Sequence, residues 1–402
     1  MSESTDNLSS LLAARRARPV PREGGPVIVY AGMYLESMGN FRTSDMSFDA
    51  DVYLRLSWRD RRLAGLTQSA VETGGTVVLN DYDSVKHLWL PDLYFSNARK
   101  ASFQEVTVPN FSLFIFPDGQ VAYSTRVTMT VACNLNLRSY PLDWQSCHID
   151  MACYAHTAQE LNLTWFEEMP LTRNENIDLP ELEIRSITGS RCDQDYYYAR
   201  TPERTQTQLY SCLKATLLLS RSLGYHMVQS YIPTGLIVVI SWVSFWIDRN
   251  AVPARVSLSF TTLLTLSTMG AGLRFALPPV SYAKAIDFWF GVNMIFIFGA
   301  LLEFAFVNSL MRRSAKFESL SRSETGEINN ALQRASALSS IGVGKEGAIA
   351  PSELRELCQQ KSEEYARVAL RVDQTCRIAF PVAFLLFNIV YWTWYCALAP
   401  SP

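Results

Sequence analysis

The sequence predicts an all-β sandwich domain followed by a bundle of four membrane-spanning helices. Residues 1–225 carry short alternating apolar runs, whereas most of the later chain is strongly apolar. One apolar segment differs from the others because hydroxyl side chains recur along it. With 402 residues, the chain has room for two domains of ordinary size.

Composition narrows the classes of function. The formal net charge is -2, so nothing points to nucleic acid as a partner. No nucleophile–base motif, phosphate-binding loop or Cys-x-x-Cys pair occurs, and the chain has only four histidines. We therefore expect neither an enzyme nor a bound metal or cofactor.

Three long apolar runs predict membrane helices. Met227–Ile247 has no charged residue, and at about 1.5 Å per residue it crosses roughly 30 Å of hydrocarbon. Phe288–Val307 is interrupted only by Glu303. Ile378–Leu398 ends in an aromatic cluster of the kind found at membrane interfaces. We expect the lipid bilayer to be the environment of this half of the chain.

A fourth helix is expected over Pro253–Leu273. Ser257, Thr261, Leu264 and Thr268 follow one another at steps of four, three and four residues, which places them on one helical face. Several copies around an axis would line a water-filled path, with Leu264 as an apolar constriction. Alternatively, the helix is buried and its hydroxyls bond to its own carbonyls.

Basic residues near the spans set the orientation. The chain between the third and fourth spans is predicted to be cytoplasmic, and the N-terminal domain and C-terminus extracellular. The domain boundaries are 1–225 for the β domain, 226–310 for three spans, 311–377 for the cytoplasmic loop and 378–402 for the last span. Within the loop, Ser352–Asp373 predicts a helix that runs into the fourth span. The basic residues are Arg312, Arg313, Lys316, Arg367, Arg371 and Arg377.

The first half predicts many short strands without long helices between them, which is typical of a β-sandwich. Pro117, Asp118 and Gly119 form a turn signal between two of the strands. Asp6–Arg18 predicts a short helix, and the polar start of the chain suggests a signal segment already removed. The strand-like runs are Val27–Tyr34, Asp51–Trp58, Phe111–Phe116, Gln120–Val131 and Thr207–Ser220.

Cysteines and sequons agree with an exported domain. Cys133 and Cys147 bracket thirteen residues, and Cys192 and Cys212 bracket nineteen. Paired spacing in an exported segment suggests disulfides. The sequons at Asn110 and Asn162 are candidate glycosylation sites.

The stretch from Cys133 to Cys147, with its Tyr140–Pro141 pair and Asp143, resembles the signature loop of the Cys-loop receptors. These are pentameric ligand-gated ion channels, and the resemblance covers about residues 25–398, within their anion-selective glycine, GABA and glutamate branch. It implies a plasma-membrane pentamer of identical or related subunits, with a small-molecule agonist bound between subunits. Other matching motifs are Trp89–Asp92, Gly224–Pro233, Pro253–Val256 and Val280–Asp287.

The resemblance also implies the residues of the agonist site. Arg55 lies on the same face of its strand as Tyr53, where it could pair with a ligand carboxylate. Aromatic rings opposite could hold an ammonium, so an amino acid or an amine is expected. Phe114 replaces an arginine of amino-acid-gated relatives. The principal face would carry Tyr94, Tyr154, His156, Tyr196, Tyr197, Tyr198 and Tyr210, and the opposing face Tyr53, Arg55 and Ser124.

Two of these assignments keep an alternative. Arg55 could form an ordinary surface ion pair, and the aromatic run from Tyr196 to Tyr198 could pack locally. The nineteen residues between Cys192 and Cys212 also exceed the usual length of the loop at this place in the family.

Pore selectivity follows from the start of the hydroxylated helix. Cation-selective relatives carry glutamate where this chain has Ala254, and Pro253 starts the helix with its positive end at the mouth. With Arg255 and Arg274, five copies would give a positive rim that favours chloride. Alternatively, Arg255 is a packed residue with a counter-charge.

Coupling between ligand site and pore is expected where the resemblance brings several loops together. Asp45, Asp143 and Arg221 could form a charge cluster, next to Tyr140, Pro141 and Lys284. Such a cluster suits a two-state switch, or else it is a static structural feature.

A subunit that assembles but conducts only with partner subunits is the alternative function.

Overall fold

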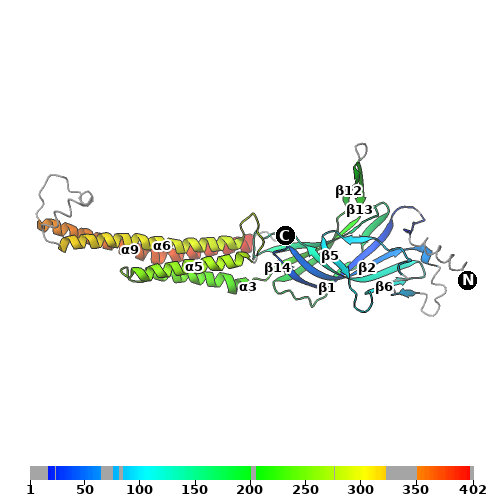
Figure 1. Cartoon of the computed structure of the whole chain (residues 1–402), viewed down its shortest axis with the longest axis horizontal. Helices are drawn as coiled ribbons and strands as arrows, with labels where there is room; N and C mark the ends of the chain where they lie inside the picture. Colours follow the sequence, from blue (N-terminus) through cyan, green and yellow to red (C-terminus); the bar gives the residue numbers. More distant parts are fainter. Residues whose placement is uncertain are drawn as a thin grey trace. The chain divides into compact units, whose positions relative to one another are not determined.

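A computed structural model describes residues 17–22, 24–64, 76–80, 85–200, 205–275, 277–322 and 351–398. The chain divides into two compact units (Figure 1). The first unit holds the chain up to Ser222 except residues 138–142. The second holds those five residues together with the chain from Leu223 onward. The tip of the Cys133–Cys147 loop therefore groups with the helical unit.

The first unit is a sandwich of two main sheets. The larger has the strand order β10-β1-β2-β7-β6-β3, with β5 also paired to β7 and β9 to β1, and the smaller has the order β11-β14-β8-β4. The strands of the larger sheet are β1 Val27–Arg42, β2 Ser47–Arg59, β3 Val77–Leu79, β5 Ala98–Phe103, β6 Phe111–Ile115, β7 Gln120–Ala132, β9 Leu161–Trp165 and β10 Leu171–Arg173. Those of the smaller sheet are β4 Leu93–Phe95, β8 Trp144–Cys153, β11 Leu182–Arg191 and β14 Cys212–Arg221.

Alternation of side chains builds the core between these sheets. Along β2, Val52, Leu54 and Leu56 are buried, whereas Tyr53 and Arg55 between them face outward. From the smaller sheet, Met151 and Leu213 are buried in the same cluster. Because side chains alternate across a strand, one hydrophobic face fixes where the polar face points.

One predicted strand is two. The run Thr207–Ser220 divides into β13 Thr205–Tyr210 and β14, and only β14 belongs to a main sheet. β13 pairs with β12 Gln194–Arg200 in a separate hairpin that stands out from the sandwich (Figure 1). Ser211 lies at the switch, where its carbonyl accepts from the backbone N–H of Cys153 and its hydroxyl from that of Leu163. These two bonds hold the chain at the point where it changes sheets.

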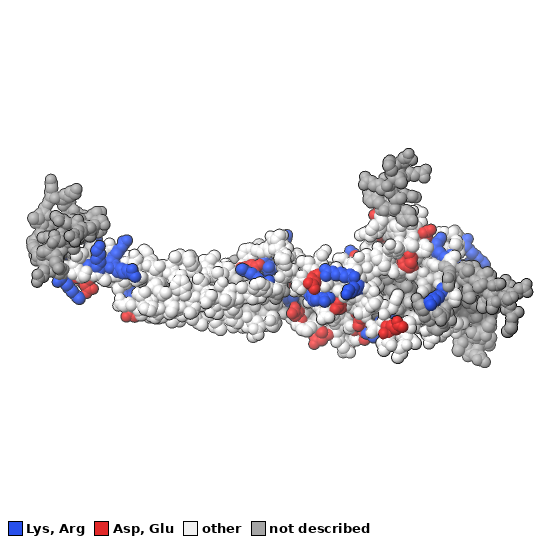
Figure 2. Space-filling model, in the orientation of Figure 1, with Lys and Arg blue, Asp and Glu red and all other residues white. Residues whose placement is uncertain are grey.

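The second unit contains four helical segments long and apolar enough to cross a membrane. On the face shown in Figure 2 its middle carries almost no charged atoms, and basic residues gather at the end where α6 finishes. The first segment is α3 Gly224–His226, a π-helical turn Met227–Tyr231, α4 Ile232–Trp242 and a 3-10 turn Val243–Phe245. The others are α5 Val252–Phe275, α6 Ala285–Arg322, and α9 Pro351–Trp392 with a π-helical end Thr393–Leu398.

Helix α9 is continuous from its cytoplasmic part into the fourth span, as predicted, and begins at Pro351. It packs along α6, which itself extends to Arg322, beyond the predicted span. Trp289 of α6 donates its indole N–H to Thr234 of α4 and stacks near Tyr391 of α9. An aromatic cluster thus ties three of the four helices together.

Most of the predicted helix Asp6–Arg18 lies outside the described residues. At the predicted turn, Gly119 has a φ of +80°, which a side chain would disfavour. Its N–H bonds to the carbonyl of Phe116 at 2.9 Å, closing the turn between β6 and β7.

Candidate agonist site and pore

The outward face of β2 presents the expected cation. Arg55 pairs in register with Ser124 of β7, and Ser124 in turn with Ser112 of β6. The Arg55 guanidinium lies 6.0 Å from the ring of Tyr34 and has no ion-pair partner among the described residues. Among the described residues, Arg55 therefore does not form the surface ion pair that was the alternative.

A second arginine stands on the same face, and the sequence analysis missed it. Arg126 of β7 is in register with Tyr53, and its guanidinium lies 5.6 Å from that ring. Asp51 holds it through an ion pair of 3.2 Å. The signal was present in the alternation of β7, which puts Arg126 two residues after Ser124 and on the same face. Arg126 is thus partly neutralised, whereas Arg55 is not.

Four tyrosines meet around β4 and the β12–β13 hairpin. Tyr94 lies edge-on to Tyr154, with ring centroids 5.6 Å apart, and Tyr196 lies edge-on to Tyr210 at 5.8 Å. Burial, and then the charge and hydrogen bond of Tyr196, raise the pKa of Tyr94 above its ordinary value. At neutral pH its hydroxyl stays protonated, so the cluster offers aromatic rings and dipoles without a formal charge.

Tyr154 is 76% exposed in the single chain, and Tyr210 is 8% exposed. One edge of the cluster is therefore open while the other is fixed by packing. Exposed aromatic rings are suited to hold a cation by cation–π contact.

His156 does not join these tyrosines. Its ring packs against Trp89, with centroids 6.4 Å apart, and its Nδ1 lies 3.5 Å from a carboxylate oxygen of Glu160. The prediction that His156 belongs to the aromatic face is therefore not supported. The side chains of Tyr197 and Tyr198 lie outside the described residues.

Both predicted disulfides are formed. Cys133 joins Cys147, and Cys192 joins Cys212. The second bond closes the base of the β12–β13 hairpin, where Cys192 N–H also bonds to the carbonyl of Cys212 at 2.9 Å. It anchors the hairpin that carries Tyr196 to the sheet.

The hydroxylated face of α5 is exposed in the single chain. Ser257, Thr261, Leu264 and Thr268 are all exposed, and Leu264 is 65% exposed. The opposite face, with Leu266 among its residues, is buried. The stripe is therefore free to face copies of itself around an axis.

The hydroxyls of this stripe nevertheless bond to their own helix. Thr261 donates to the carbonyl of Ser257 at 2.8 Å, and Thr268 to that of Thr265 at 2.9 Å. The alternative interpretation is therefore correct in one respect, because the hydroxyls bond to carbonyls of their own helix. It is wrong in the other, because the stripe is exposed in the single chain.

Arg255 requires a correction. Its side chain is 0% exposed and forms two bonds to the Asp373 carboxylate of α9, at 3.1 and 3.2 Å. It also donates twice to the carbonyl of Ile247. Arg255 therefore does not contribute to a positive rim, because its charge is directed into the helix bundle. Arg274 is 64% exposed at the other end of α5, with Nε 3.8 Å from Asp287.

Two family models match the chain. The "Neurotransmitter-gated ion-channel ligand binding domain" covers residues 5–223, and the "Neurotransmitter-gated ion-channel transmembrane region" covers residues 230–342. The chain is a neurotransmitter-gated ion channel subunit. A "Glutamate-gated chloride channel" of Drosophila melanogaster is 35% identical over 94% of this chain and 88% of its own length. A "Glycine receptor subunit beta-type 4" of Caenorhabditis elegans is 34% identical over 96% of this chain and 87% of its own length.

Membership of this family fixes the topology of the channel subunit. It is a multi-pass plasma-membrane protein whose N-terminal sandwich is extracellular and whose four apolar helices form the membrane region. The sequons stay predictions: Asn110 is exposed, whereas the Asn162 amide oxygen accepts from Arg191 at 2.7 Å.

The charge cluster at the base of the channel's sandwich differs from the prediction. Arg221 forms two buried hydrogen bonds to the Asp143 carboxylate, at 2.8 and 3.2 Å, and Glu181 is a second, exposed partner at 3.4 Å. Asp45 does not take part, because its carboxylate lies 3.8 Å from Arg42 on the surface. The reason is local: Asp45 is within a tight turn, next to its own basic neighbour.

The tip of the disulfide loop is built into the helical unit. The backbone N–H groups of Ala285 and Ile286 donate to the carbonyls of Arg138 and Tyr140, at 2.8 and 3.1 Å. The Tyr140 hydroxyl lies 3.3 Å from Nε2 of His226 at the start of the first span. These contacts join the loop tip to the beginnings of two channel helices.

Lys284 and Asp287 complete the start of α6. The ammonium of Lys284 lies 3.2 Å from the Asp287 carboxylate, which also accepts the Lys284 backbone N–H. Pro141 follows Tyr140 within the same loop tip. We expect this group of residues to carry motion to the pore helices.

We expect Leu264→Thr to raise the resting leak of the channel or its sensitivity to agonist. A ring of exposed leucines can stop conduction by dewetting, and a hydroxyl would keep the constriction wet. Voltage-clamp recording with counts of surface protein measures both effects. Leu266→Thr, on the buried face of the same helix, should instead lower expression without leak. If Leu264→Thr reaches the surface and changes neither property, the constriction lies elsewhere, and Pro253 is the next candidate for it.

Proposed function

We propose that this subunit forms a chloride-conducting pentamer opened by a small zwitterionic amino acid bound between neighbouring subunits. The observation that carries the proposal is the guanidinium of Arg55 on the outward face of β2, which has no ion-pair partner within the described part of the chain. The tyrosine cluster lies around β4 of the smaller sheet and the β12–β13 hairpin, and it carries no formal charge. A ligand that placed its carboxylate at Arg55 and its ammonium at the tyrosines would lie between two adjacent subunits, one of which supplies Arg55 and the other the tyrosines.

The names of the relatives support this class of ligand. One is called a glutamate-gated chloride channel and the other a glycine receptor subunit, and both agonists are amino acids. The described chain offers two arginines on the presumed carboxylate side, Arg55 and Arg126, although Phe114 replaces a third. Since Asp51 neutralises Arg126, Arg55 should make the main charged contact.

We expect Arg55→Ala to weaken activation by roughly 1.5–3 kcal/mol, on the order of tenfold to a hundredfold in agonist concentration. Arg55→Lys should recover only part, because an ammonium lacks the planar fork that pairs with a carboxylate. Lys100→Ala, which removes an exposed cation of β5, is the control and should change nothing. Recording from cells screened with amino acids and amines provides the dose–response curves.

Activation that is indifferent to Arg55→Ala, in channels counted at the surface, would contradict an amino-acid agonist. An amine held by Tyr53, Tyr94 and Tyr154 would then be the better hypothesis.

Chloride selectivity is proposed from the start of α5. The helix has no acidic residue in its first turn, and Pro253 and Ala254 are exposed there. The positive dipole end of the helix would face the mouth of the pore. Because Arg255 is paired with Asp373, the helix ends supply this potential without a guanidinium ring.

We expect deletion of Pro253 combined with Ala254→Glu to shift permeability from chloride towards sodium. Five carboxylates at one level would repel anions and attract cations. Reversal potentials measured during dilution of external sodium chloride distinguish the two selectivities. A reversal potential that follows sodium in the unaltered channel would end the anion proposal.

An accessory subunit is the second candidate function. The favouring observation is the long hairpin between Cys192 and Cys212, which departs from the family length. Expression of this chain alone tests it, since an accessory subunit would reach the surface without agonist-gated current.

A further inference from the structure

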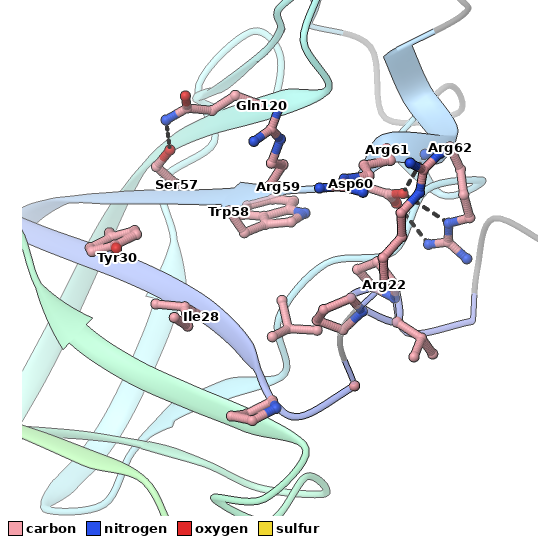
Figure 3. Close-up of a pocket in the computed structure, with 16 residues that line it drawn as sticks. Arg22, Ile28, Tyr30, Ser57, Trp58, Arg59, Asp60, Arg61, Arg62 and Gln120 are labelled. Carbon is pink, nitrogen blue, oxygen red and sulfur yellow. Dashed lines mark hydrogen bonds and ion pairs between the residues drawn. The ribbon is translucent and has the colours of Figure 1, made fainter.

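A cavity of about 590 Å³ opens at the end of the sandwich where β1 begins and β2 ends (Figure 3). Its wall comes from the segment before β1, from Ser57–Arg62 and from Gln120 at the start of β7. We call it the arginine cavity, because Arg22, Arg59, Arg61 and Arg62 line it. Among the described lining residues Asp60 is the one carboxylate, so these five side chains together carry a charge of +3. Its size is that of a pocket for a small organic molecule.

The arginine cavity is separate from the agonist site. Neither Arg55 nor any residue of the tyrosine cluster lines it. Arg59 stands four residues beyond Arg55 on β2, which corresponds to roughly 13 Å along a strand. A ligand of ordinary size in the cavity would not reach the Arg55 guanidinium.

The charges of the cavity are only partly compensated. Asp60 is 2% exposed and forms an ion pair with Arg62, whose guanidinium donates to both carboxylate oxygens at 2.9 and 2.7 Å. Arg59 lies 3.9 Å from Asp118, and both side chains are more than half exposed, so this pair is weak. Arg22 and Arg61 have no carboxylate partner among the described residues.

The rest of the wall is apolar or aromatic. Val20, Ile28 and Tyr30 are exposed there at 72%, 46% and 38%. Trp58 forms part of the floor, and its buried indole N–H has no acceptor among the described residues. Figure 3 shows Trp58 beside Arg59, Tyr30 and Ile28 on the neighbouring strand, and Arg22 and Arg61 across the opening.

From these features we propose that the arginine cavity binds an amphipathic organic anion, a carboxylate carried on an apolar body. The free guanidinium groups of Arg22 and Arg61 would pair with the carboxylate, since the planar fork suits that geometry. The exposed apolar side chains would cover the body of the ligand. A small inorganic anion would use the charges and leave the apolar wall in water.

The test measures equilibrium binding of 1-naphthoate to the purified, assembled full-length channel in detergent by isothermal titration calorimetry. Neutral 1-naphthamide, of nearly the same shape, is the ligand control. We expect saturable binding of the carboxylate and at least tenfold weaker binding of the amide. Arg22→Ala and Arg61→Ala should each weaken naphthoate binding about tenfold, the usual loss for a charge-assisted hydrogen bond.

Arg22 and Arg61 are exposed, so both variants should assemble, and Lys100→Ala controls for the loss of one surface charge. Naphthoate binding that is retained in both arginine variants, or absent from the unaltered channel, overturns the proposal. Binding lost in Arg55→Ala but kept in Arg61→Ala places the anion at the agonist site and also overturns it. Because the measurement does not require opening, it is independent of the function proposed above.

Discussion

Asp373→Ala should destabilise the assembled channel by about 3–5 kcal/mol, because it leaves the Arg255 charge buried without its partner. Both side chains are at most 2% exposed, and two bonds of 3.1 and 3.2 Å join them. The remaining bonds of Arg255, to the Ile247 carbonyl, cannot neutralise a charge. Thermal unfolding of the detergent-purified channel, followed by size-exclusion chromatography, measures the loss.

Arg249→Ala is the matched control for the Asp373 experiment. Its Nε lies 3.9 Å from the same carboxylate, but the side chain is 26% exposed, so its removal should have a small effect. The double variant Arg255→Met with Asp373→Leu should recover much of the stability, since paired removal leaves no buried charge. Equal melting of Asp373→Ala and the unaltered channel would contradict the structural role of the pair.

Asp143→Ala should be similarly damaging in the extracellular unit, again by about 3–5 kcal/mol. The Arg221 and Asp143 side chains are 1% and 2% exposed, and the Arg221 backbone N–H also bonds to the Asp143 carbonyl at 3.2 Å. Loss of the carboxylate would remove the buried counter-charge of the Arg221 guanidinium at the end of β14 and leave it the exposed Glu181 carboxylate 3.4 Å away. Surface assembly and thermal unfolding are the readouts.

Two variants make the Asp143 experiment specific. Glu181→Ala removes a carboxylate that is 59% exposed at 3.4 Å from the same guanidinium, and should cost about 1 kcal/mol or less. Asp45→Ala tests the corrected cluster and should be nearly neutral, because the ion pair of Asp45 with Arg42 is exposed on both sides. A large effect of Asp45→Ala beside that of Asp143→Ala would restore the cluster of Asp45, Asp143 and Arg221 that the sequence suggested, and an Asp143→Ala channel as stable as the unaltered one would contradict the buried pair.

The division into a sandwich and four apolar helices was predictable because each depends on a local period. Alternation along β2 and β7, and the uncharged run after Met227, are visible without any partner. The break at Ser211 was not visible, since an apolar alternation continues while the chain moves from one sheet to another. Periodicity indicates which face of a strand is buried, but it does not indicate with which other strand it pairs.

The candidate site was predictable in part for a related reason. Arg55 was found from the family resemblance and the alternation of its own strand. The alternation of β7 places Arg126 on the same face as Ser124, but its position opposite Tyr53 depends on the register of β7 against β2. The partner of Arg255 lies 118 residues away on α9, and its sequence position gives no hint of the contact. Pairings of this kind depend on how helices pack, which no local pattern contains.

The hydroxyls of α5 have a consequence for how an ion would travel along the proposed pore. Those of Ser257, Thr261, Thr265 and Thr268 donate to a carbonyl three or four residues earlier, for example Thr261 to Ser257 and Thr265 to Thr261. The lumen would then be lined by oxygen lone pairs, which accept hydrogen from water but repel an anion. Chloride would cross this stretch inside its hydration shell, with wall-bound water as the intermediary. Selectivity would arise at the helix ends, and the stripe would serve as a conduit for hydrated ions.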